Sequence, residues 1–351
     1  MKKTIALLFG GKGEEHAVSC RSAAAVYKNL RPDRYHVILI GIDRGGDFFF
    51  YRGDGTEIGD PNFRKKNENL VPTFPIRLGS RSGFYSPEGT VFVDLALPIL
   101  HGRGGEDGEI QGLLSAAGIP FIGCDGVTSS VCFDKEYTKR MAEAAGVPTV
   151  RGITVYPEED LASVTARVRG FFSPTQRLFI KPARQGSSVG ASVADSVEQI
   201  AKCIDLACAY GKALVEEYIG EKRELEVALL QRDGELLFAG PGEISCAAPL
   251  YSYKEKYGST ETAALPHADI PASVRKELFS YCVTLSRVLS LRSLSRLDFF
   301  LTPEGALYFN EVNTLPGFTE TSLYPKLWEA EGLSFSSLLD VLIGEALARF
   351  S

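Results

Sequence analysis

The chain of 351 residues lacks several features that would assign a function at once. Its seven cysteines contain no C-x-x-C pair and are odd in number, so we expect small, buried, apolar side chains in a reducing compartment. There is no block of Lys and Arg, and the net charge of −6 argues against a nucleic-acid partner. No apolar run is long enough to span a bilayer, so no membrane partner is expected.

A secretion signal is not expected either. Lys2 and Lys3 precede the apolar run Thr4 to Phe9, as at the start of a signal peptide, but the run is too short and no cleavage site follows. Hydrophobic residues make up 44% and charged residues 23%, the composition of an ordinary soluble globular protein, and the length allows two or three domains. We therefore expect a cytoplasmic protein.

The first third of the chain is predicted to form an α/β domain. Thr4 to Phe9 has the continuous apolar character of a buried parallel strand. A helix opened by Glu14, Glu15 and His16 and running through Ala17 to Leu30 is followed by a strand from Tyr35 to Ile42, which completes a βαβ unit. Val91 to Leu100 is predicted as a further buried strand. The glycines at 10, 11 and 13 do not follow G-x-G-x-x-G, so no dinucleotide site is claimed.

Two loops of this domain carry polar side chains that allow two interpretations. Residues 101–109, HGRGGEDGE, follow a predicted strand, and open α/β sheets bind ligands beyond the carboxyl ends of their strands. A long polar turn is the equally weighted alternative. Glu15 lies in the first turn of a helix, where a carboxylate is favoured by the helix dipole, so the residues alone favour capping.

The centre of the chain is predicted to form a small α+β domain with a phosphate-binding loop. A strand ends in Lys181 and runs into a Gly/Ser loop up to Gly190, which offers N–H groups, hydroxyls and an ammonium group. It is not a Walker A sequence, and alone it is weak. Strand backbone within 213–230 is suited to hydrogen-bond an adenine edge, although an edge strand with solvated Glu is the simpler interpretation.

The strongest chemical signal is a predicted β-hairpin in residues 293–319. Its two apolar arms flank Thr302-Pro-Glu-Gly305, which suits a type I turn. Side-chain alternation puts Arg296, Asp298 and Phe300 on one face of the first strand, and Phe309, Glu311 and Asn313 on one face of the second. A connection with an even number of residues makes these the same face; a three-residue loop opposes them.

In the even case, Asp298, Glu311 and Asn313 crowd together beside Arg296. Oxygen-bearing side chains on apolar strands are costly to bury without a cation among them. Two carboxylates and an amide oxygen are ligands that Mg²⁺ takes when phosphates complete its shell. A solvated hairpin face with an Arg–Asp pair is the alternative. Further upstream, the aromatic segment from Leu250 to Tyr257 is predicted to be a lid over a site.

The ordered set of motifs resembles the D-alanine–D-alanine ligases of the ATP-grasp superfamily over essentially the full length. One such motif would be weak, whereas the set in this order is specific. The motifs are Leu8-Phe-Gly-Gly, Glu15-His-x-Val-Ser19, His101-Gly-x-Gly-Gly-Glu-Asp-Gly-x-x-Gln-Gly112, Lys181-Pro-x-x-x-Gly-Ser-Ser-Val-Gly190, Tyr253-x-x-Lys-Tyr257, Arg296-x-Asp298 and Glu311-x-Asn313-Thr-x-Pro-Gly317.

The resemblance implies a three-domain ATP-grasp architecture, mixing α/β and α+β, with an N-terminal Rossmann-like parallel sheet. The expected domains are an N-terminal one with the first substrate site, a central one with the phosphate loop, and a C-terminal one with the hairpin and lid: 1–133, 134–213 and 214–351. The implied reaction is the ATP-dependent ligation of two D-alanines through an acyl phosphate, for peptidoglycan precursors. ATP and two Mg²⁺ ions, with Mn²⁺ as an alternative, are the implied cofactors, and the family implies a homodimer.

The resemblance also implies roles for individual residues. The metal ligands would be Asp298, Glu311 and Asn313. The ATP contacts would be Lys135, Lys181, Glu216, Glu217, Ile219, Glu224, Lys256 and Phe309. The first D-Ala would be held by Glu15 with His101 nearby, the lid would be closed onto Glu15 by Ser187 and Tyr257, the oxyanion would be stabilised by Arg296 and the N–H of Gly317, and the second carboxylate would be bound by Ser322 and Leu323.

Tyr257 bears on the second substrate. In related D-Ala–D-lactate ligases a Phe is expected at this position, so we expect an amine nucleophile and the product D-Ala–D-Ala. Another ATP-grasp ligase, such as a D-Ala–D-lactate ligase, and a catalytically silent ATP-binding protein are the alternatives. The silent protein would have lost key residues, yet all are present in the sequence: Arg296, Asp298, Glu311 and Lys256. The chain departs from the family's usual pattern at Ala17, Gln185 and Ser295.

Overall fold

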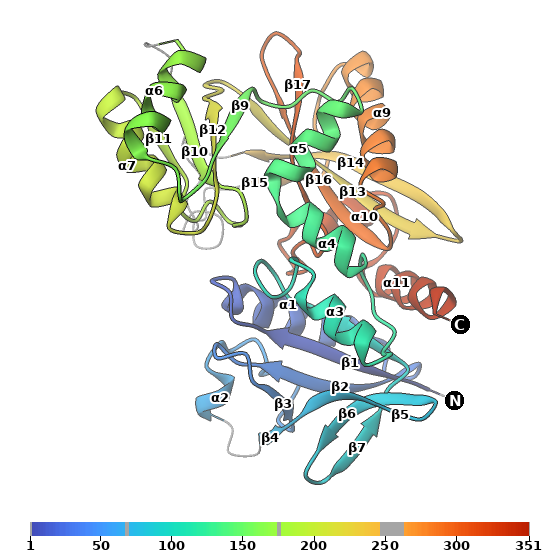
Figure 1. Cartoon of the computed structure of the whole chain (residues 1–351). Coiled ribbons are helices and arrows are strands. Elements are labelled where there is room, and N and C mark those ends of the chain that lie inside the picture. Colours follow the sequence, from blue (N-terminus) through green and yellow to red (C-terminus); the bar gives the residue numbers. More distant parts are fainter. Residues whose placement is uncertain (1, 67–69, 174–176, 246–262, 351) are drawn as a thin grey trace.

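The computed structural model describes residues 2–66, 70–173, 177–245 and 263–350. Figure 1 shows three parts: an N-terminal domain below, a central domain at upper left and a C-terminal sheet with its helices at upper right. Helix α5 lies between the two upper parts (Figure 1). The mixed α/β and α+β class expected from the sequence is therefore present.

The N-terminal domain is built on a five-stranded sheet of order β4-β3-β2-β1-β8. Strand β1, which lies between β2 and β8, pairs in parallel with both of them, as expected for a Rossmann-like sheet. The elements of this part are β1 (Lys3–Gly10), α1 (His16–Asn29), β2 (Tyr35–Ile42), β3 (Phe48–Tyr51), α2 (Phe63–Lys66), β4 (Val71–Pro72), β8 (Leu95–Pro98) and α3 (Glu109–Ala116).

Helices on both faces of this sheet explain the continuous apolar run of β1. Ile5 and Leu7 share a core cluster with side chains of α1, whereas Ala6 and Leu8 share one with side chains of α3. All four are completely buried. A strand that is covered on both sides has no face for polar residues, and the predicted buried parallel strand is confirmed.

The single strand predicted from Val91 to Leu100 is wrong. The segment contains two strands of different sheets, β7 (Gly89–Phe92) and β8, because the chain turns at Asp94. The Asp94 carboxylate accepts a hydrogen bond from the backbone N–H of Thr4 at 2.8 Å, which fixes the entry into β8 beside β1. β7 belongs to a small antiparallel sheet with β5 (Phe74–Leu78) and β6 (Arg81–Ser86).

The central domain is a four-stranded antiparallel sheet of order β11-β10-β12-β9, covered on one face by α6 and α7. Because β12 pairs with both β10 and β9, the division that follows the sheets comes after Glu217 and not at 213. The elements are β9 (Gly152–Val155), α6 (Leu161–Phe171), β10 (Leu178–Pro182), β11 (Ser192–Ala194), α7 (Val197–Cys208) and β12 (Ala213–Glu217).

The C-terminal part is a five-stranded antiparallel sheet of order β15-β14-β13-β16-β17. Side chains of α9 cover one face, and those of α10 and α11 pack on the other. The elements are β13 (Arg223–Arg232), β14 (Glu235–Ser245), β15 (Ala263–Leu265), α9 (Ala272–Val288), β16 (Leu294–Leu301), β17 (Leu307–Asn313), α10 (Leu323–Ala330) and α11 (Phe335–Arg349).

Two helices connect the N-terminal domain to the upper parts, α4 (Gly126–Phe133) and α5 (Lys135–Ala144). Asp134 caps α5, since its carboxylate accepts a hydrogen bond from the N–H of Glu136 at 3.2 Å. α5 packs against β17 of the C-terminal sheet, and its first residue donates a backbone hydrogen bond to Ala183 O in the central domain at 2.9 Å. Helix α5 therefore contacts both the central domain and the C-terminal sheet.

The cysteines agree with the expectation of small, buried side chains. Every cysteine in the described ranges is free, and all but the half-buried Cys208 are buried. No helix formed by residues 2–66, 70–173, 177–245 and 263–350 is both long and apolar enough to cross a membrane.

Helix α11 ties the end of the chain to the first domain. The Arg349 guanidinium donates to the carbonyl oxygens of Gly123 at 2.8 Å and Phe121 at 2.6 Å, and the Tyr35 hydroxyl donates to Asp340 at 2.6 Å. Apolar side chains of α11 share one core cluster with β1 and α1. The N-terminal core is thus completed by the last helix.

We predict that Arg349→Met lowers the free energy of unfolding by about 2 kcal/mol, because two charge-assisted hydrogen bonds to backbone carbonyls are lost while the aliphatic stem remains. Urea unfolding followed by circular dichroism measures the change. The unfolding free energy of Arg349→Lys, which keeps one charged donor group, should lie between those of the wild type and of Arg349→Met. An unfolding free energy equal to that of the wild type in Arg349→Met would contradict the assignment.

Candidate active site

The predicted hairpin is present, but its connection is odd. Leu301 pairs with Leu307, so residues 302–306 join the strands, and Gly305 N donates to Thr302 O at 3.0 Å to close the predicted turn. Antiparallel partners lie on the same face of a sheet, so regular pairing from this turn would put Glu311 on the face opposite to Asp298. The even connection assumed from the sequence is therefore wrong.

A one-residue bulge in β17 restores the predicted cluster. Phe299 pairs with Phe309, but Asp298 pairs with Glu311 and Arg296 with Asn313, so Asn310 is an extra residue. The bulge shifts the alternation by one position, and Glu311 and Asn313 face the same side as Asp298. The predicted grouping of Asp298, Glu311 and Asn313 is thus confirmed by a different geometry.

Phe309 lies before the bulge and therefore falls on the other face. Its ring is fully buried and packs against Phe299 with ring centroids 5.7 Å apart. The expectation that Phe309 shares a face with Glu311 and Asn313 is wrong, because the alternation changes at Asn310. Phe309 belongs to the core cluster under α9.

The polar cluster on β16 is held together by Arg296. Its guanidinium donates to both oxygens of Asp298, at 2.8 and 2.7 Å, and lies 3.1 Å from Glu226 Oε2 on β13. The Asn313 amide donates to Asp298 at 3.0 Å. Burial alone would lower the pKa of Arg296, but the Asp298 and Glu226 carboxylates raise it well above its ordinary value. Arg296 is a permanent cation in this cluster.

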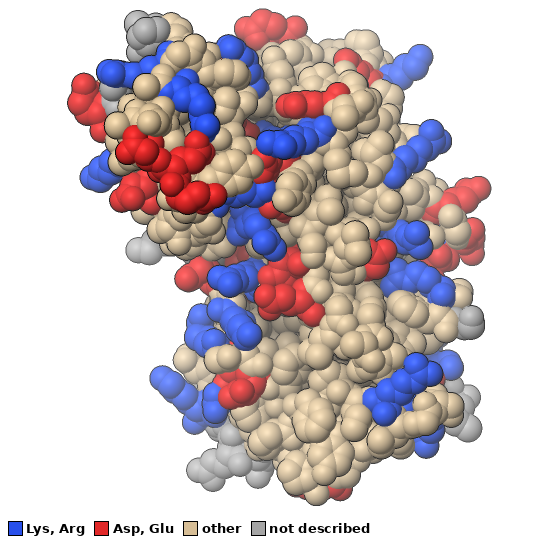
Figure 2. All heavy atoms as spheres, viewed as in Figure 1, with Lys and Arg blue, Asp and Glu red and all other residues tan. Residues whose placement is uncertain are grey.

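Two clefts meet at this cluster. The upper cleft runs between the central and C-terminal sheets, and the lower cleft between the hairpin and the N-terminal domain. Figure 2 shows basic and acidic side chains gathered near the level where the upper and lower parts meet. Residues that line both clefts are Lys135, Gly186, Ser187, Glu226, Ile244 and Glu311.

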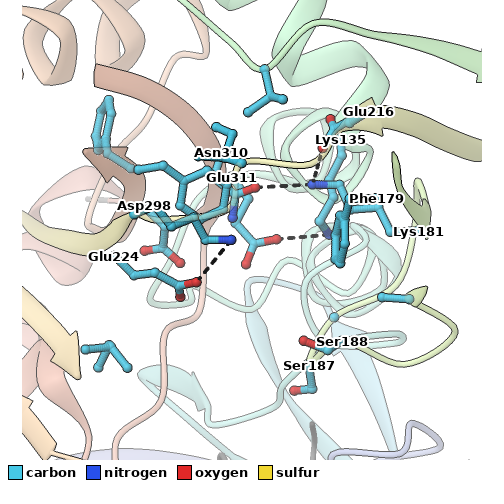
Figure 3. A pocket seen from close by; sticks show the side chains of 18 of the residues that line it. Lys135, Phe179, Lys181, Ser187, Ser188, Glu216, Glu224, Asp298, Asn310 and Glu311 are labelled. Atoms are coloured by element: carbon cyan, nitrogen blue, oxygen red, sulfur yellow. Dashed lines mark hydrogen bonds and ion pairs between the residues drawn. The ribbon is translucent and has the colours of Figure 1, made fainter. Parts of the chain in front are cut away.

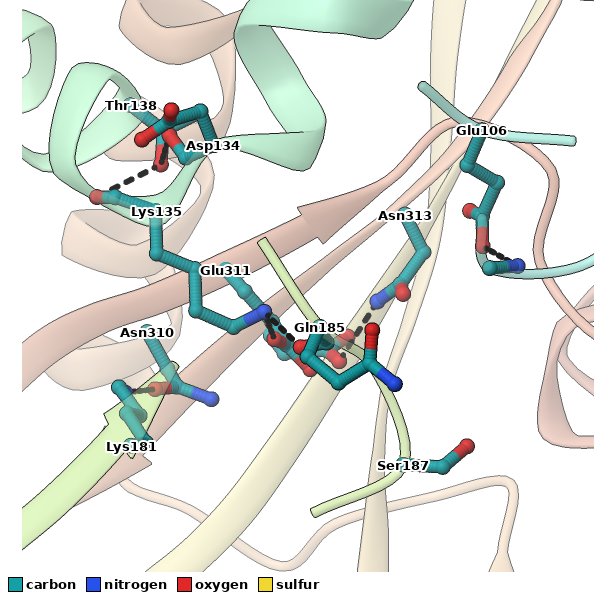
Figure 4. Close-up of polar contacts among 12 residues, drawn as sticks. Glu106, Asp134, Lys135, Thr138, Lys181, Gln185, Ser187, Asn310, Glu311 and Asn313 are labelled. Carbon is teal, nitrogen blue, oxygen red and sulfur yellow. Dashed lines mark hydrogen bonds and ion pairs between the residues drawn. The ribbon is translucent and has the colours of Figure 1, made fainter. Parts of the chain in front are cut away.

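Lysines from two elements reach into the upper cleft (Figure 3). Lys135, the first residue of α5, lies 3.1 Å from Glu311 Oε2 and donates to the Gln185 carbonyl at 2.8 Å. Lys181, on β10, lies 3.0 Å from Glu216 Oε2 and donates to Asn310 Oδ1 at 3.2 Å. Figure 4 shows the contacts of Lys135 with Glu311 and Gln185 and that of Lys181 with Asn310. Both predicted phosphate lysines thus flank the predicted metal ligands.

The remaining predicted contacts of the upper cleft come from the end of β12 and the start of β13. Its lining includes Glu216, Glu217, Ile219 and Glu224, as predicted, together with Lys222. Burial lowers the pKa of Lys222, whose ammonium lies 3.7 Å from Glu224 and 4.2 Å from the centre of the Phe300 ring. The cleft therefore combines apolar, acidic and basic surface.

The lower cleft joins the predicted loops of the N-terminal and central domains. The Ser187 hydroxyl donates to Glu15 Oε1 at 2.5 Å. Ser187 has a left-handed backbone with φ +51°, strained for a residue with a side chain. Glu15 has room only because two neighbours are glycines: a Cβ on Gly102 or on Gly186 would lie 2.1 or 3.2 Å from its Oε2.

His101 and Glu106 support the floor of the lower cleft. The His101 ring lies 3.0 Å from Ser22 Oγ through Nε2 and 3.0 Å from Leu315 O through Nδ1, and burial lowers its pKa. Glu106 accepts from the N–H groups of Gly102 at 2.9 Å and Leu315 at 3.1 Å. Burial and the nearby Glu15 raise the pKa of Glu106 to about 8.

The turn before α10 also lines the lower cleft. Ser322 accepts from the N–H of Thr319 at 3.0 Å, and Leu323 begins the helix. A Cβ on Gly317 would lie 2.9 Å from Ser322 Oγ, so the glycine lets the two segments approach. Gly317, Ser322 and Leu323 all line this cleft, as do Glu15 and His101.

Comparison with known proteins gives the family. The family model for the N-terminus of D-Ala–D-Ala ligases matches residues 4–124, and the model for the C-terminus matches residues 141–344. This chain belongs to the D-alanine–D-alanine ligase family.

Individual relatives cover nearly the whole chain. A D-alanine–D-alanine ligase B from Bradyrhizobium diazoefficiens is 40% identical over 99% of this chain and 94% of its own length. A D-alanine–D-alanine ligase from Thermoanaerobacter sp. (strain X514) is 36% identical over 99% of this chain and 97% of its own length.

Solved structures of the family show the same fold. The VanG D-Ala:D-Ser ligase from Enterococcus faecalis has a TM-score of 0.88 at 35% identity and covers 99% of this chain and 100% of its own. The D-alanine–D-alanine ligase from Coxiella burnetii has a TM-score of 0.86 at 30% identity, with 99% and 95% covered. The ATP-grasp fold is thereby established.

The donor set of the hairpin fits a hard divalent cation. Asp298 and Glu311 line the upper cleft and Asn313 the lower one, all on one side of the hairpin. Within the described ranges, no group of three or more His, Cys, Asp or Glu side chains is placed to hold a metal alone. An ion held by two carboxylates and an amide oxygen therefore needs further oxygen ligands, which phosphates of a nucleotide supply.

The structure does not describe every site residue predicted from the sequence, and it adds some that were not predicted. Lys256 and Tyr257 lie outside the residues that the structure describes. Sequence reasoning missed Glu226, which lies opposite Asp298 on β13, and Lys222. It also gave no role to Glu106, although the residue stands within the quoted 101–112 motif. Glu226 had a detectable signal, since Glu224-x-Glu226 repeats a carboxylate on one strand face.

We predict that Gly102→Ala reduces ligase turnover by about tenfold, because the new Cβ displaces Glu15 from Ser187, and small displacements of an active-site group are costly. Gly104→Ala is the matched control. Both glycines have positive φ, +64° and +83°, but nothing lies within 4 Å of a Cβ on Gly104. Steady-state rates of the two variants measure the difference; equal rates would contradict the clash.

Proposed function

We propose that this chain joins two D-alanine molecules in an ATP-dependent, ADP-forming reaction. The observation that carries the proposal is the junction of the two clefts. There, the carboxylates Asp298 and Glu311, the Asn313 amide and the Arg296 guanidinium lie between the lysines of the upper cleft and Glu15 of the lower cleft. Family membership supports the same reaction.

In the first step, the carboxylate of one D-Ala attacks the γ-phosphate of ATP, and ADP leaves. Glu15 binds the ammonium group of this D-Ala, and its hydrogen bond to Ser187 holds the loop of the central domain against it. Lys135 and Lys181 stabilise the negative charge of the phosphates. Asp298, Glu311 and Asn313 would hold Mg²⁺, which would neutralise further charge on the phosphates.

In the second step, the amine of another D-Ala attacks the carbonyl carbon of the acyl phosphate, and phosphate leaves after the tetrahedral intermediate collapses. Arg296 and the N–H of Gly317 stabilise the oxyanion of this intermediate. Ser322 and Leu323, which line the same cleft as Glu15, bind the carboxylate of the second D-Ala.

A second candidate differs only in the nucleophile. VanG, one of the solved structures reported above, is a D-Ala:D-Ser ligase, so D-Ser is the alternative second substrate, beside D-lactate. Tyr257 favours an amine over a hydroxy acid, and D-Ala and D-Ser both offer an amine. The proposal includes peptidoglycan precursor synthesis, a cytoplasmic location and a homodimer.

Measurement of ADP release with different acceptors tests the proposal. We expect ADP release with ATP, Mg²⁺ and D-Ala alone, no release with L-Ala, and no mixed product when D-Ser or D-lactate is added in equal amount. Mass spectrometry identifies the dipeptide. Release of ADP without D-Ala, or a mixed product as the main one at pH 7 to 8, would overturn the assignment.

We predict that Glu311→Gln lowers turnover by about 100-fold or more without unfolding the protein, because the amide keeps the shape but loses the charge that binds the cation. Glu304→Gln, in the exposed turn of the same hairpin, is the matched control. Unchanged turnover in Glu311→Gln at equal melting temperature would remove Glu311 from the metal site.

A further inference from the structure

Helix α5 presents two lysines to the central domain, and the reaction described above uses only one of them. Lys135 and Lys139 are four residues apart, so they lie one turn apart on the same side of the helix. Lys135 lines the upper cleft. Lys139 is 6% exposed, belongs to no cleft lining among the described residues, and forms an ion pair with Glu216.

Glu216 is shared between two ammonium groups. Its Oε1 contacts Lys139 and its Oε2 lies 3.0 Å from Lys181, while the whole residue is only 3% exposed. Burial alone would raise the pKa of Glu216, but the two lysines lower it to about 2. The carboxylate is therefore ionised, and the group of three carries one surplus positive charge.

Of the two lysines, Lys181 alone faces the cleft. It lines the upper cleft and also donates to Asn310 Oδ1 at 3.2 Å. To contact a phosphate oxygen, its ammonium group must give up much of its interaction with Glu216. A buried carboxylate left without a cationic partner strongly destabilises the folded protein. A second partner that stays in place is therefore needed if Lys181 is to move.

We propose that Lys139 is a positioning residue for the nucleotide: it neutralises Glu216, so that Lys181 is free to bind phosphate. The proposal rests on the proposed function for the identity of the ligand, ATP with Mg²⁺. Lys139 itself does not touch the nucleotide. Removal of its charge leaves Lys181 as the one direct ion-pair partner of Glu216 among the described residues, which holds Lys181 back and weakens nucleotide binding.

The charge on Lys139 is sensitive to pH. Burial lowers its pKa to about 8, although Glu216 on β12 and Glu143 on its own helix raise it; Lys181 on β10 lowers it further. When Lys181 moves to phosphate, its repulsion of Lys139 decreases and the pKa of Lys139 rises. Nucleotide binding then takes up a proton at pH values above about 8, so affinity falls as pH increases.

Titration calorimetry with a non-hydrolysable ATP analogue and Mg²⁺ tests the proposal without turnover. We expect Lys139→Met to bind about tenfold more weakly than the wild type, and Lys139→Arg to bind nearly as well. Lys202→Met, an exposed lysine on α7, is the control.

The pH profile of binding separates this role from simple structural support. Between pH 7 and 9.5, the affinity of the wild type should fall, whereas that of Lys139→Arg should stay nearly constant, since arginine keeps its charge. This comparison also decides the matter if Lys139→Met does not fold. Parallel profiles, or wild-type affinity in a folded Lys139→Met, would overturn the proposal. Failure of D-Ala-dependent ADP release would refute the proposed function alone, since binding is measured separately.

Discussion

The chemistry of this protein depends on a one-residue bulge in a β-strand. The extra residue Asn310 changes which side chains of β17 face the clefts, and without this change the carboxylate of Glu311 would point into the core with Phe309. Burying a carboxylate there would be costly. The bulge also places Asn310 and Glu311 within reach of two different lysines, Lys181 and Lys135. The bulge thus brings the hairpin, α5 and β10 together at the candidate site.

Charge balance around that point comes from elements that are distant in sequence. Helix α5 supplies Lys135 to Glu311 and Lys139 to Glu216, so a single helix neutralises carboxylates of both upper sheets. Asp298 on the hairpin and Glu226 on the neighbouring strand β13 share Arg296. Each buried charge has a partner before any ligand arrives. A phosphate or a cation therefore exchanges partners within an existing network and does not create one.

Patterns of local sequence predicted much of the fold. The apolar run of β1, the helix α1 that follows it and the two arms of the hairpin were all recognisable, because each depends on neighbours in the chain. The turn at Asp94 was not, since the interaction that stabilises it is a hydrogen bond to Thr4 on another strand. The position of the bulge was equally invisible, because strand register depends on which partner positions pair.

The candidate site also combines features that local sequence predicts with features that depend on strand pairing. Residue types and motif order predicted Asp298, Glu311 and Asn313, while alternation alone placed Phe309 on the wrong face. Glu226 escaped notice because its importance comes from a neighbouring strand, where it lies opposite Asp298. Side chains whose role depends on cross-strand neighbours become visible only when register is known.

The position of α11 has a consequence for how the chain is made. Its apolar side chains belong to the same core cluster as Ile5 and Leu7, which are separated from them by nearly the whole sequence. During synthesis the first domain leaves the ribosome with part of its hydrophobic surface uncovered, and this surface stays open until the last helix emerges. Contacts between residues so far apart in sequence form slowly and leave intermediates prone to aggregation. The N-terminal core is therefore complete only once α11 has emerged.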